Sequence, residues 1–516
     1  MKTSSDLFDL IKSLTGHEKR YFILFCSFQA GSKKYLKLYY LIEKQKTYNE
    51  EKLISSLKGD PMCNQLAVSK NYLYTMILKA LNSYNANFKT SFASSIDTIE
   101  ILYYKGLFKQ CFKIITKLKK QIYKLEKFHL LFEVLIWERA LLTQMEDFKN
   151  YFDLRNNIKK EEDELLQKIS SINTYSYASF YSYYSYIKDD LAFKHIREDD
   201  FKKNAAFLIA PVDESRLCFQ EKVHRLSGQS YYYHFVKDFD KASASSKKLL
   251  QLMHDNPLQI ELMPFGYLAA CMTYMLMLLQ LGHYDEILSH CKKVRALETN
   301  LKQTKSSRLL QAAIFNTAPS YELAVYVTIA DVKKARLLLP EIEAGIEDFK
   351  DLMNEQLFSV WCFNVALTYF LDNEYKLALK WLNHIINETF DRIRTDFILS
   401  VTIFRLILHY ELQNESFYPY LLRSSYRTIS KLHFNPRILA TLLSGLKILF
   451  NATDKKKIEQ SLKQIRRDLT PLLSYSDFRG WLNYFDITQW LDSKIHNTSF
   501  AEIAQKEALK RRVKAK

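Results

Sequence analysis

Apolar residues recur every three to four positions along most of this chain, which is the spacing of one face of an α-helix. The segment 66–81 shows it most clearly, because apolar pairs repeat every four residues at 72/73, 76/77 and 80/81. The same spacing predicts shorter helices over 6–14, 17–28, 33–45 and 49–57. We therefore expect residues 1–90 to form a helical N-terminal module or cap.

Five short segments further along the chain share a second pattern. Each begins with a small or polar turn, continues with a bulky apolar residue, and ends on a small or compact residue three positions later. Each lies between two stretches with helical spacing, so each predicts the turn of a helical hairpin. The segments are Gly106–Cys111, Lys237–Ala242, Gly282–Ile287, Ala330–Ala335 and Asn373–Ala378.

The clearest hairpin covers residues 359–389. Ala366 precedes Ala378 by twelve residues, and these small side chains predict the point where its two helices cross closely. Tyr369 and Tyr375 are expected to fill the space around that crossing. This pattern resembles the tetratricopeptide repeat, a helical hairpin with small residues at the crossing. The resemblance implies a right-handed superhelix of stacked hairpins, so the expected fold is all-α with a helical N-terminal module.

The repeat length departs from that family. The anchors Ala242, Ile287, Ala335 and Ala378 are 45, 48 and 43 residues apart, whereas the family repeat is about 34 residues long. We expect seven to nine hairpins between about 91 and 495, followed by a basic tail at 496–516. Degenerate copies are predicted at Asp147–Tyr151, Asp190–Lys194, Glu415–Tyr420 and Asp454–Lys457.

Composition agrees with a helical protein. The 516 residues include only 10 Gly and 9 Pro, fewer than the many tight turns of a sheet protein of this size require, and 48% are hydrophobic. The formal net charge is +17. A nucleic-acid or acidic-partner surface is one explanation. We favour charge spread over solvated helix faces, because most basic residues alternate with acidic ones.

Cysteine usage bears on the compartment. Seven cysteines lie scattered, with no C-x-x-C pair, which is typical of free thiols in a reducing compartment. No secretory signal is evident at the start, so we expect a cytoplasmic protein. Residues 262–282 carry no charge and are long enough to span a bilayer. Since they stand where a hairpin needs its first helix, we expect a helix buried in the stack.

Catalytic signatures are missing. No two of the ten glycines are near enough to build a phosphate-binding loop, and there is no G-x-S-x-G elbow. The densest set of possible metal ligands is His283, Asp285, His290 and Cys291, which we interpret as a polar turn followed by a half-buried helix. We therefore expect no catalytic activity, no cofactor and no metal.

Stacked hairpins are typical of proteins that bind other proteins. We expect a scaffold or adaptor that holds a partner protein or peptide in the groove lined by the first helices. In tetratricopeptide domains that bind peptides, an asparagine at the position matching Asn364 often forms a hydrogen bond with the peptide backbone. Further candidates for the groove are polar or aromatic residues of another first helix: Tyr267, Thr273 and Tyr274.

The alternative is a nucleic-acid-binding or transcription-regulatory protein. Its reading helix would be 66–81, supported by 51–57, and the candidate contacts are Lys70, Asn71, Tyr74 and Lys79. The aromatic segment 175–186 could stack bases, or its serines could allow a neighbouring helix to approach closely. A membrane adaptor contacting acidic lipid through the basic tail has no other support. The sequence leaves the partner, the pathway and the oligomeric state open.

Overall fold

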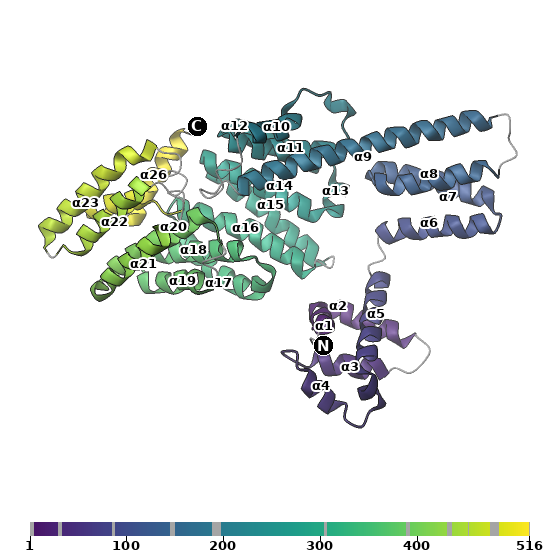
Figure 1. The fold of residues 1–516 in the computed structure, drawn as a ribbon, viewed down its shortest axis with the longest axis horizontal. Coiled ribbons are helices and arrows are strands. Elements are labelled where there is room, and N and C mark those ends of the chain that lie inside the picture. Colours follow the sequence, from purple (N-terminus) through teal and green to yellow (C-terminus); the bar gives the residue numbers. More distant parts are fainter. Residues whose placement is uncertain are drawn as a thin grey trace. The chain divides into compact units, whose positions relative to one another are not determined.

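In the computed structural model, helices make up nearly all of the described chain (Figure 1). No β-strand occurs among these residues, so the predicted all-α class is confirmed for them. The structure describes residues 5–28, 34–84, 88–144, 150–187, 198–303, 307–388, 393–430, 436–452, 454–474 and 484–514. The predicted repeat copy at Asp190–Lys194, and most of the copy at Asp147–Tyr151, lie outside these ranges.

The chain divides into two compact units, residues 1–170 and 171–516. Residues 91–170, which we assigned to the predicted repeat region, group with the N-terminal helices in the first unit. The helices of the first unit are α1 (Asp6–Ser13), α2 (Gly16–Ser27), α3 (Lys34–Glu43), α4 (Glu50–Ser56), η1 (Pro61–Gln65), α5 (Leu66–Tyr84), α6 (Phe88–Tyr104), α7 (Phe108–Leu125), α8 (Phe128–Leu142) and the first part of α9 (Tyr151–Ile187).

The second unit holds the end of α9 and all later helices. They are α10 (Glu198–Ile209), η3 (Glu214–Arg216), α11 (Phe219–Phe235), α12 (Phe239–His254), α13 (Pro257–Leu262), α14 (Pro264–Leu281), α15 (Tyr284–Gln303), α16 (Arg308–Thr328), α17 (Val332–Phe349), η4 (Lys350–Leu352), α18 (Glu355–Leu371), α19 (Tyr375–Glu388), α20 (Thr395–Glu411), η6 (Glu415–Phe417), α21 (Tyr418–Ser430), α22 (Pro436–Phe450), α23 (Lys455–Leu469), η7 (Thr470–Ser474), α25 (Ile487–Ile495) and α26 (Phe500–Lys514).

The first five helices follow the predicted pattern closely. Thr15 separates α1 from α2, and with Glu18 it forms a capping box that satisfies the first amides of α2. Asn49 caps α4, and its side chain accepts from the amide of Lys52. The apolar face of α5 is buried in a common core with residues of α1 to α4. The spacing of apolar residues thus predicted the elements and most of the buried face, but Tyr72, a member of the predicted pattern, is 51% exposed.

The five recurring segments share one turn geometry. The first residue of each has a positive φ between 51° and 79°, and the last residue has no exposed surface. In each turn the amide of the second residue donates to the carbonyl five positions earlier, a bond that satisfies the end of the preceding helix. These bonds are Leu107–Leu102 (2.9 Å), Asp238–Tyr233 (2.8 Å), His283–Leu278 (3.0 Å), Asp331–Tyr326 (2.8 Å) and Glu374–Tyr369 (2.9 Å).

Small residues lie where paired helices approach each other. Ala366 on α18 and Ala378 on α19 are fully buried, and these two helices pack against one another. Gly345 of α17 lies so near α16 that a Cβ atom there would fall 2.2 Å from the ring of Phe315. Phe315 stacks in turn on Trp361 of α18, with 4.7 Å between ring centroids. The close crossings therefore connect successive hairpins into one core.

The first helices of successive hairpins are neighbours. Helix α14 contacts α11 and α16, and α16 contacts α18, while each also packs on the second helix of its own hairpin. Residues 500–514, which we expected to be part of a basic tail, form helix α26 instead. Its Ala504 and Ala508 are buried, and the Gln505 amide donates to the carbonyl of Ala330 at 3.0 Å. Helix α26 thus packs against the turn between α16 and α17.

The aromatic segment of α9 has two different faces. Ser179, Ser182 and Ser185 are buried, and a Cβ atom on Gly228 of α11 would lie 3.0 Å from the backbone of Ser179. The serines thus allow α11 to approach closely, as one of the two interpretations predicted. The other face carries exposed rings, at Tyr177, Phe180, Tyr183 and Tyr184.

Candidate functional site

The groove candidates of α14 are packed inside the stack. Tyr267, Thr273 and Tyr274 are at most 5% exposed. Helix α14 has helices on several sides, so most of its circumference is covered. Burial and then the hydrogen bond to Glu286 raise the pKa of the Tyr274 hydroxyl. The three hydroxyls bond to neighbouring helices: Tyr267 to His254 (3.1 Å), Thr273 to Tyr231 (2.9 Å) and Tyr274 to Glu286 (2.6 Å).

Asn364 differs from these three residues. It is half-buried on α18, between the buried side chains of Phe363 and Val365. Its backbone carbonyl accepts a hydrogen bond from the Thr368 hydroxyl at 2.8 Å. Of the four predicted groove residues, Asn364 alone keeps an appreciable exposed fraction.

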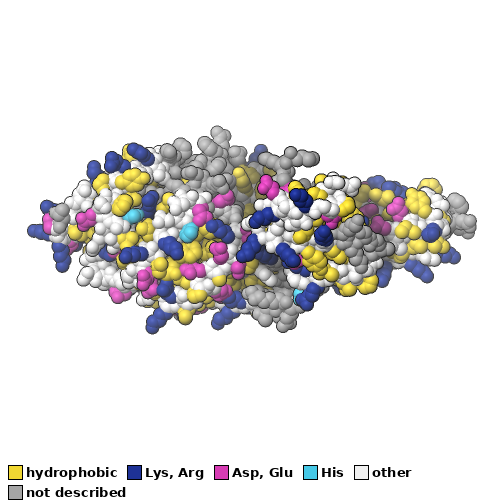
Figure 2. Space-filling view, turned by 90° about the horizontal axis from the view of Figure 1, so that it is seen from below, with side chains coloured by type: hydrophobic (Ala, Val, Ile, Leu, Met, Phe, Trp, Pro, Cys, Tyr) yellow, Lys and Arg dark blue, Asp and Glu magenta, His cyan; other side chains and the backbone are white. Residues whose placement is uncertain are grey.

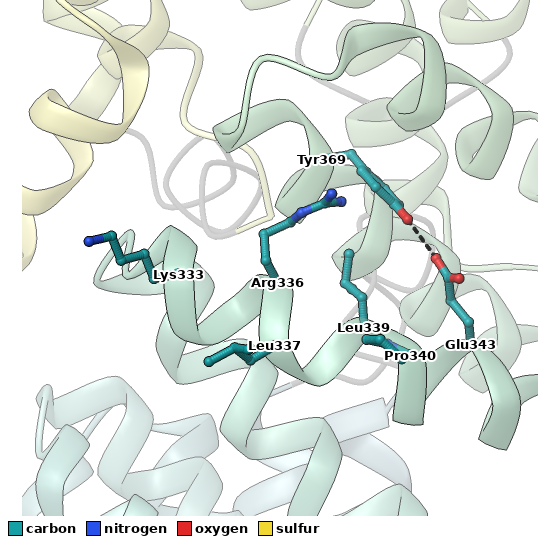
Figure 3. Close-up of a pocket in the computed structure, with 7 residues that line it drawn as sticks. All are labelled: Lys333, Arg336, Leu337, Leu339, Pro340, Glu343 and Tyr369. Carbon is teal, nitrogen blue, oxygen red and sulfur yellow. Dashed lines mark hydrogen bonds between the residues drawn. The ribbon is translucent and has the colours of Figure 1, made fainter.

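The structure brings together a different set of residues in a surface hollow of about 550 Å³ between α17 and α18 (Figure 3). Apolar and charged side chains share its wall, and it is open to solvent on one side. We call it the α17 hollow. Its lining residues are Lys333, Arg336, Leu337, Leu339, Pro340, Glu343 and Tyr369.

A hydrogen-bonded group orders the polar wall of the α17 hollow. The Tyr369 hydroxyl donates to Glu343 at 2.8 Å, as drawn in Figure 3. The guanidinium of Arg336 lies over the Tyr369 ring, 4.7 Å from its centroid, and pairs with Asp372 at 3.0 Å. Burial, followed by the bond to Glu343, raises the pKa of Tyr369. This wall is therefore held in place before any ligand arrives.

The apolar wall is formed by Leu337 and Pro340. Leu337 is 79% exposed, because it stands two residues after the buried Ala335 and so lies about 200° around the helix from it. Pro340 stands inside α17 and has no amide hydrogen, so it cannot donate to the carbonyl of Arg336 four residues earlier. The hollow thus combines an exposed apolar side chain with a stretch of α17 that lacks one helical backbone hydrogen bond.

The sequence contained a signal for the α17 hollow that our prediction did not use. A proline follows a run of three leucines at 337–339, inside a stretch with helical spacing. Only two of these leucines can face the core of an amphipathic helix, so the third has to face outward. Which residues surround it is decided by α18, which comes later in the chain.

The candidate nucleic-acid contacts lie on α5 of the first unit. Lys70 is largely buried, and its ammonium donates to Glu50 at 2.7 Å and to the Tyr48 hydroxyl at 2.5 Å. Burial alone would lower the pKa of Lys70, but these two bonds outweigh it and raise the pKa. Lys70 therefore holds α5 to the start of α4 and is not offered to a phosphate.

The other three candidates have mixed surroundings. Asn71 and Lys79 are exposed, while Tyr74 is half-buried against the core of the first unit. Exposed apolar side chains, Val68 and Leu78, lie on the same helix. The outward face of α5 is therefore mixed, with a single exposed lysine, and does not present the row of cations that a phosphate backbone would need.

Neither the suspected metal ligands nor any other His, Cys, Asp and Glu side chains form a metal-binding group in the described part of the chain. His290 packs edge-on against Tyr274, and the buried Cys291 thiol contacts Met275. Among the described helices, α14 is also the one long and apolar enough to cross a membrane, and half of that stretch is buried in the stack.

Comparison with known proteins adds no further assignment. No family model matches the chain, and no curated protein is significantly similar to it.

Proposed function

We propose that this protein is a non-catalytic scaffold that binds a partner protein through the helical hairpins of its second unit. The hairpins would form a tetratricopeptide-like superhelix. Their shared turns, their buried small residues and the contacts between successive first helices support that arrangement. The proposed location is the cytoplasm, where the seven free cysteines would remain reduced.

The observation that carries this proposal is the α17 hollow. An exposed Leu337 beside the cationic Lys333 and Arg336 suits a partner segment in which an apolar side chain is followed by an acidic one. Apolar contact would supply most of the binding free energy, and the charges would set its orientation.

The test is affinity capture of the tagged full-length protein from its native extract after nuclease treatment. Substitution of Leu337→Asp places a carboxylate in the apolar wall, so we expect at least about a tenfold loss of the captured partner. Leu309→Asp is the matched control, because Leu309 is also an exposed helical leucine but lies outside the hollow. Equal recovery with both variants would contradict the assignment of this site.

A further inference from the structure

Helix α7 carries a continuous row of lysines on its outer face. Five of them follow one another at intervals of four, four, three and four residues, and all five are exposed. At 100° per residue they occupy an arc of about 80°, and they extend along the helix for about 22 Å. We call them the α7 lysine row: Lys109, Lys113, Lys117, Lys120 and Lys124.

No acid balances this row. The chain has no Asp or Glu between Glu100 and Glu126. Within the described residues, no carboxylate lies within ion-pair distance of the five ammonium groups. Lys119 shows the contrast, because it points to another side of α7 and pairs with Glu138 at 2.6 Å and with Glu161 at 2.8 Å. Glu138 and Glu161, which α8 and α9 direct toward α7, thus pair with a lysine outside the row.

The row weakens the helix that carries it. Like charges three or four residues apart repel one another, and the row contains four such steps. Lys109 also stands in the first turn of α7, where the helix dipole disfavours a cation. Placing an acidic residue four positions from a lysine, as α9 does at Lys159 and Asp163, would have removed this repulsion. A bound polyanion would remove it as well.

The surroundings of the row distinguish between possible polyanions. The apolar face of α7 lies opposite the row and packs on α6 and α8 through Cys111, Ile115, Leu118 and Ile122. It is therefore not available for insertion into a lipid surface. Lysine is depleted from protein interfaces, which use aromatic residues and arginine. The phosphates of a nucleic-acid backbone can pair with regularly spaced ammonium groups, and this pairing requires no apolar contact.

We propose that the α7 lysine row binds the phosphate backbone of a nucleic acid, independently of its sequence. The ammonium groups replace condensed counterions along one strand, and four residues of helix advance about 6 Å between successive contacts. Phe112, which is 46% exposed, borders the row and offers a face on which a base can stack. This site lies in the first unit and does not depend on the α17 hollow.

The experiment is fluorescence anisotropy with the full-length protein and two labelled probes, a 30-residue oligothymidine and a 30-base-pair DNA duplex. With five contacts to a single strand, the logarithm of the association constant should fall with the logarithm of salt concentration with a slope of about −3.5. Replacing Lys113, Lys117 and Lys120 by Gln should reduce the magnitude of this slope by about 2 and weaken binding about tenfold or more at 0.1 M salt.

The matched control removes the same charge from other helices. Lys376→Gln, Lys380→Gln and Lys455→Gln neutralise three exposed lysines of α19 and α23. We expect binding within about twofold of the unsubstituted protein, since these lysines do not belong to the row. An equal loss in both variants would show that net charge alone is responsible and would overturn the proposal. No loss in the α7 variant would overturn it as well.

Two further probes test whether the α7 lysine row binds a different polyanion instead of a nucleic acid. Vesicles of phosphatidylserine and phosphatidylcholine test a membrane surface, and poly-glutamate tests an acidic protein segment. Binding of either probe as tight as that of the oligonucleotide, and equally dependent on the row, would overturn the assignment to nucleic acid. Because Leu337→Asp leaves α7 unchanged, failure of the partner-capture test would not affect this result.

Discussion

Single residues in a left-handed conformation end many of the helices. Glycine adopts positive φ without strain, and Gly106 and Gly282 occupy two of the shared turns. Other turns place a larger residue there, such as Asn373 (φ 61°) or Gln413 (φ 53°). A side chain with a Cβ atom pays about 1 kcal/mol or more for this conformation. The turn is retained because its backbone bonds and the packing on both sides determine it.

Gln413→Gly should therefore stabilise the second unit by about 0.5–1 kcal/mol, because it relieves the strain of the turn between α20 and α21 at an exposed position. Urea unfolding followed by tryptophan fluorescence measures the change. Gln413→Ala is the control and should have little effect, since alanine keeps the strained Cβ atom. A destabilised glycine variant would show that the turn does not impose this strain.

At the scale of elements, the packing of two helices against each other depends on small residues at the point where they cross. Gly345 allows α17 to lie against the ring of Phe315 on α16. That ring cannot easily move, because Trp361 stacks on one side and Phe349 contacts it at 5.6 Å between centroids. The sequence pattern of small residues predicted such crossings in general, but it did not single out this glycine.

Gly345→Ala should destabilise the second unit by about 1–3 kcal/mol, because the new methyl group overpacks the Phe315 site. The emission of the neighbouring Trp361 and the urea midpoint report the change. Gly266→Ala is the matched control on α14. A Cβ atom there meets nothing closer than 3.7 Å, so alanine should stabilise the helix by up to about 1 kcal/mol. Similar effects of the two substitutions would argue against the close crossing.

The molecule as a whole buries several ionisable groups in their neutral forms. Burial raises the pKa of the thiols of Cys271, Cys291 and Cys362 to about 12. A free thiol titrates near about 8.5, so the unfolded chain releases these protons at a lower pH than the folded one. The stability that these groups contribute is present below about pH 8.5 and is lost as the pH rises through about 12.

We therefore expect alkaline unfolding. The urea midpoint should be nearly constant from pH 7 to 8.5 and fall above about pH 9, with each thiol adding a slope of up to about 1.4 kcal/mol per pH unit. A variant with alanine at the three positions should have a lower midpoint at pH 7 but a shallower fall. Parallel curves for the two proteins would mean that these thiols do not cause the alkaline loss.

Much of the architecture was predictable because its causes are local. Helical periodicity, caps such as Thr15 and Asn49, and the small residues of the hairpin turns act within a few positions of the chain. The five recurring segments accordingly predicted the positions of five helix turns, while the positive φ of the first residue in each is a finding of the structure. The superhelical arrangement and the partner-binding function stay predictions, since neither follows from local geometry.

The sequence by itself determined the helices, their turns and the spacing of the α7 lysines. The composition of the whole chain did not reveal that row, because acidic residues alternate with the lysines in most other segments. Figure 2 shows basic and acidic side chains interspersed on one face of the molecule. Only the tertiary structure decided which side chains are free. It buried Tyr267 and Tyr274, paired Lys70 with Glu50, and left Leu337 exposed. Burial and pairing are set by neighbours distant in sequence, which no local pattern contains.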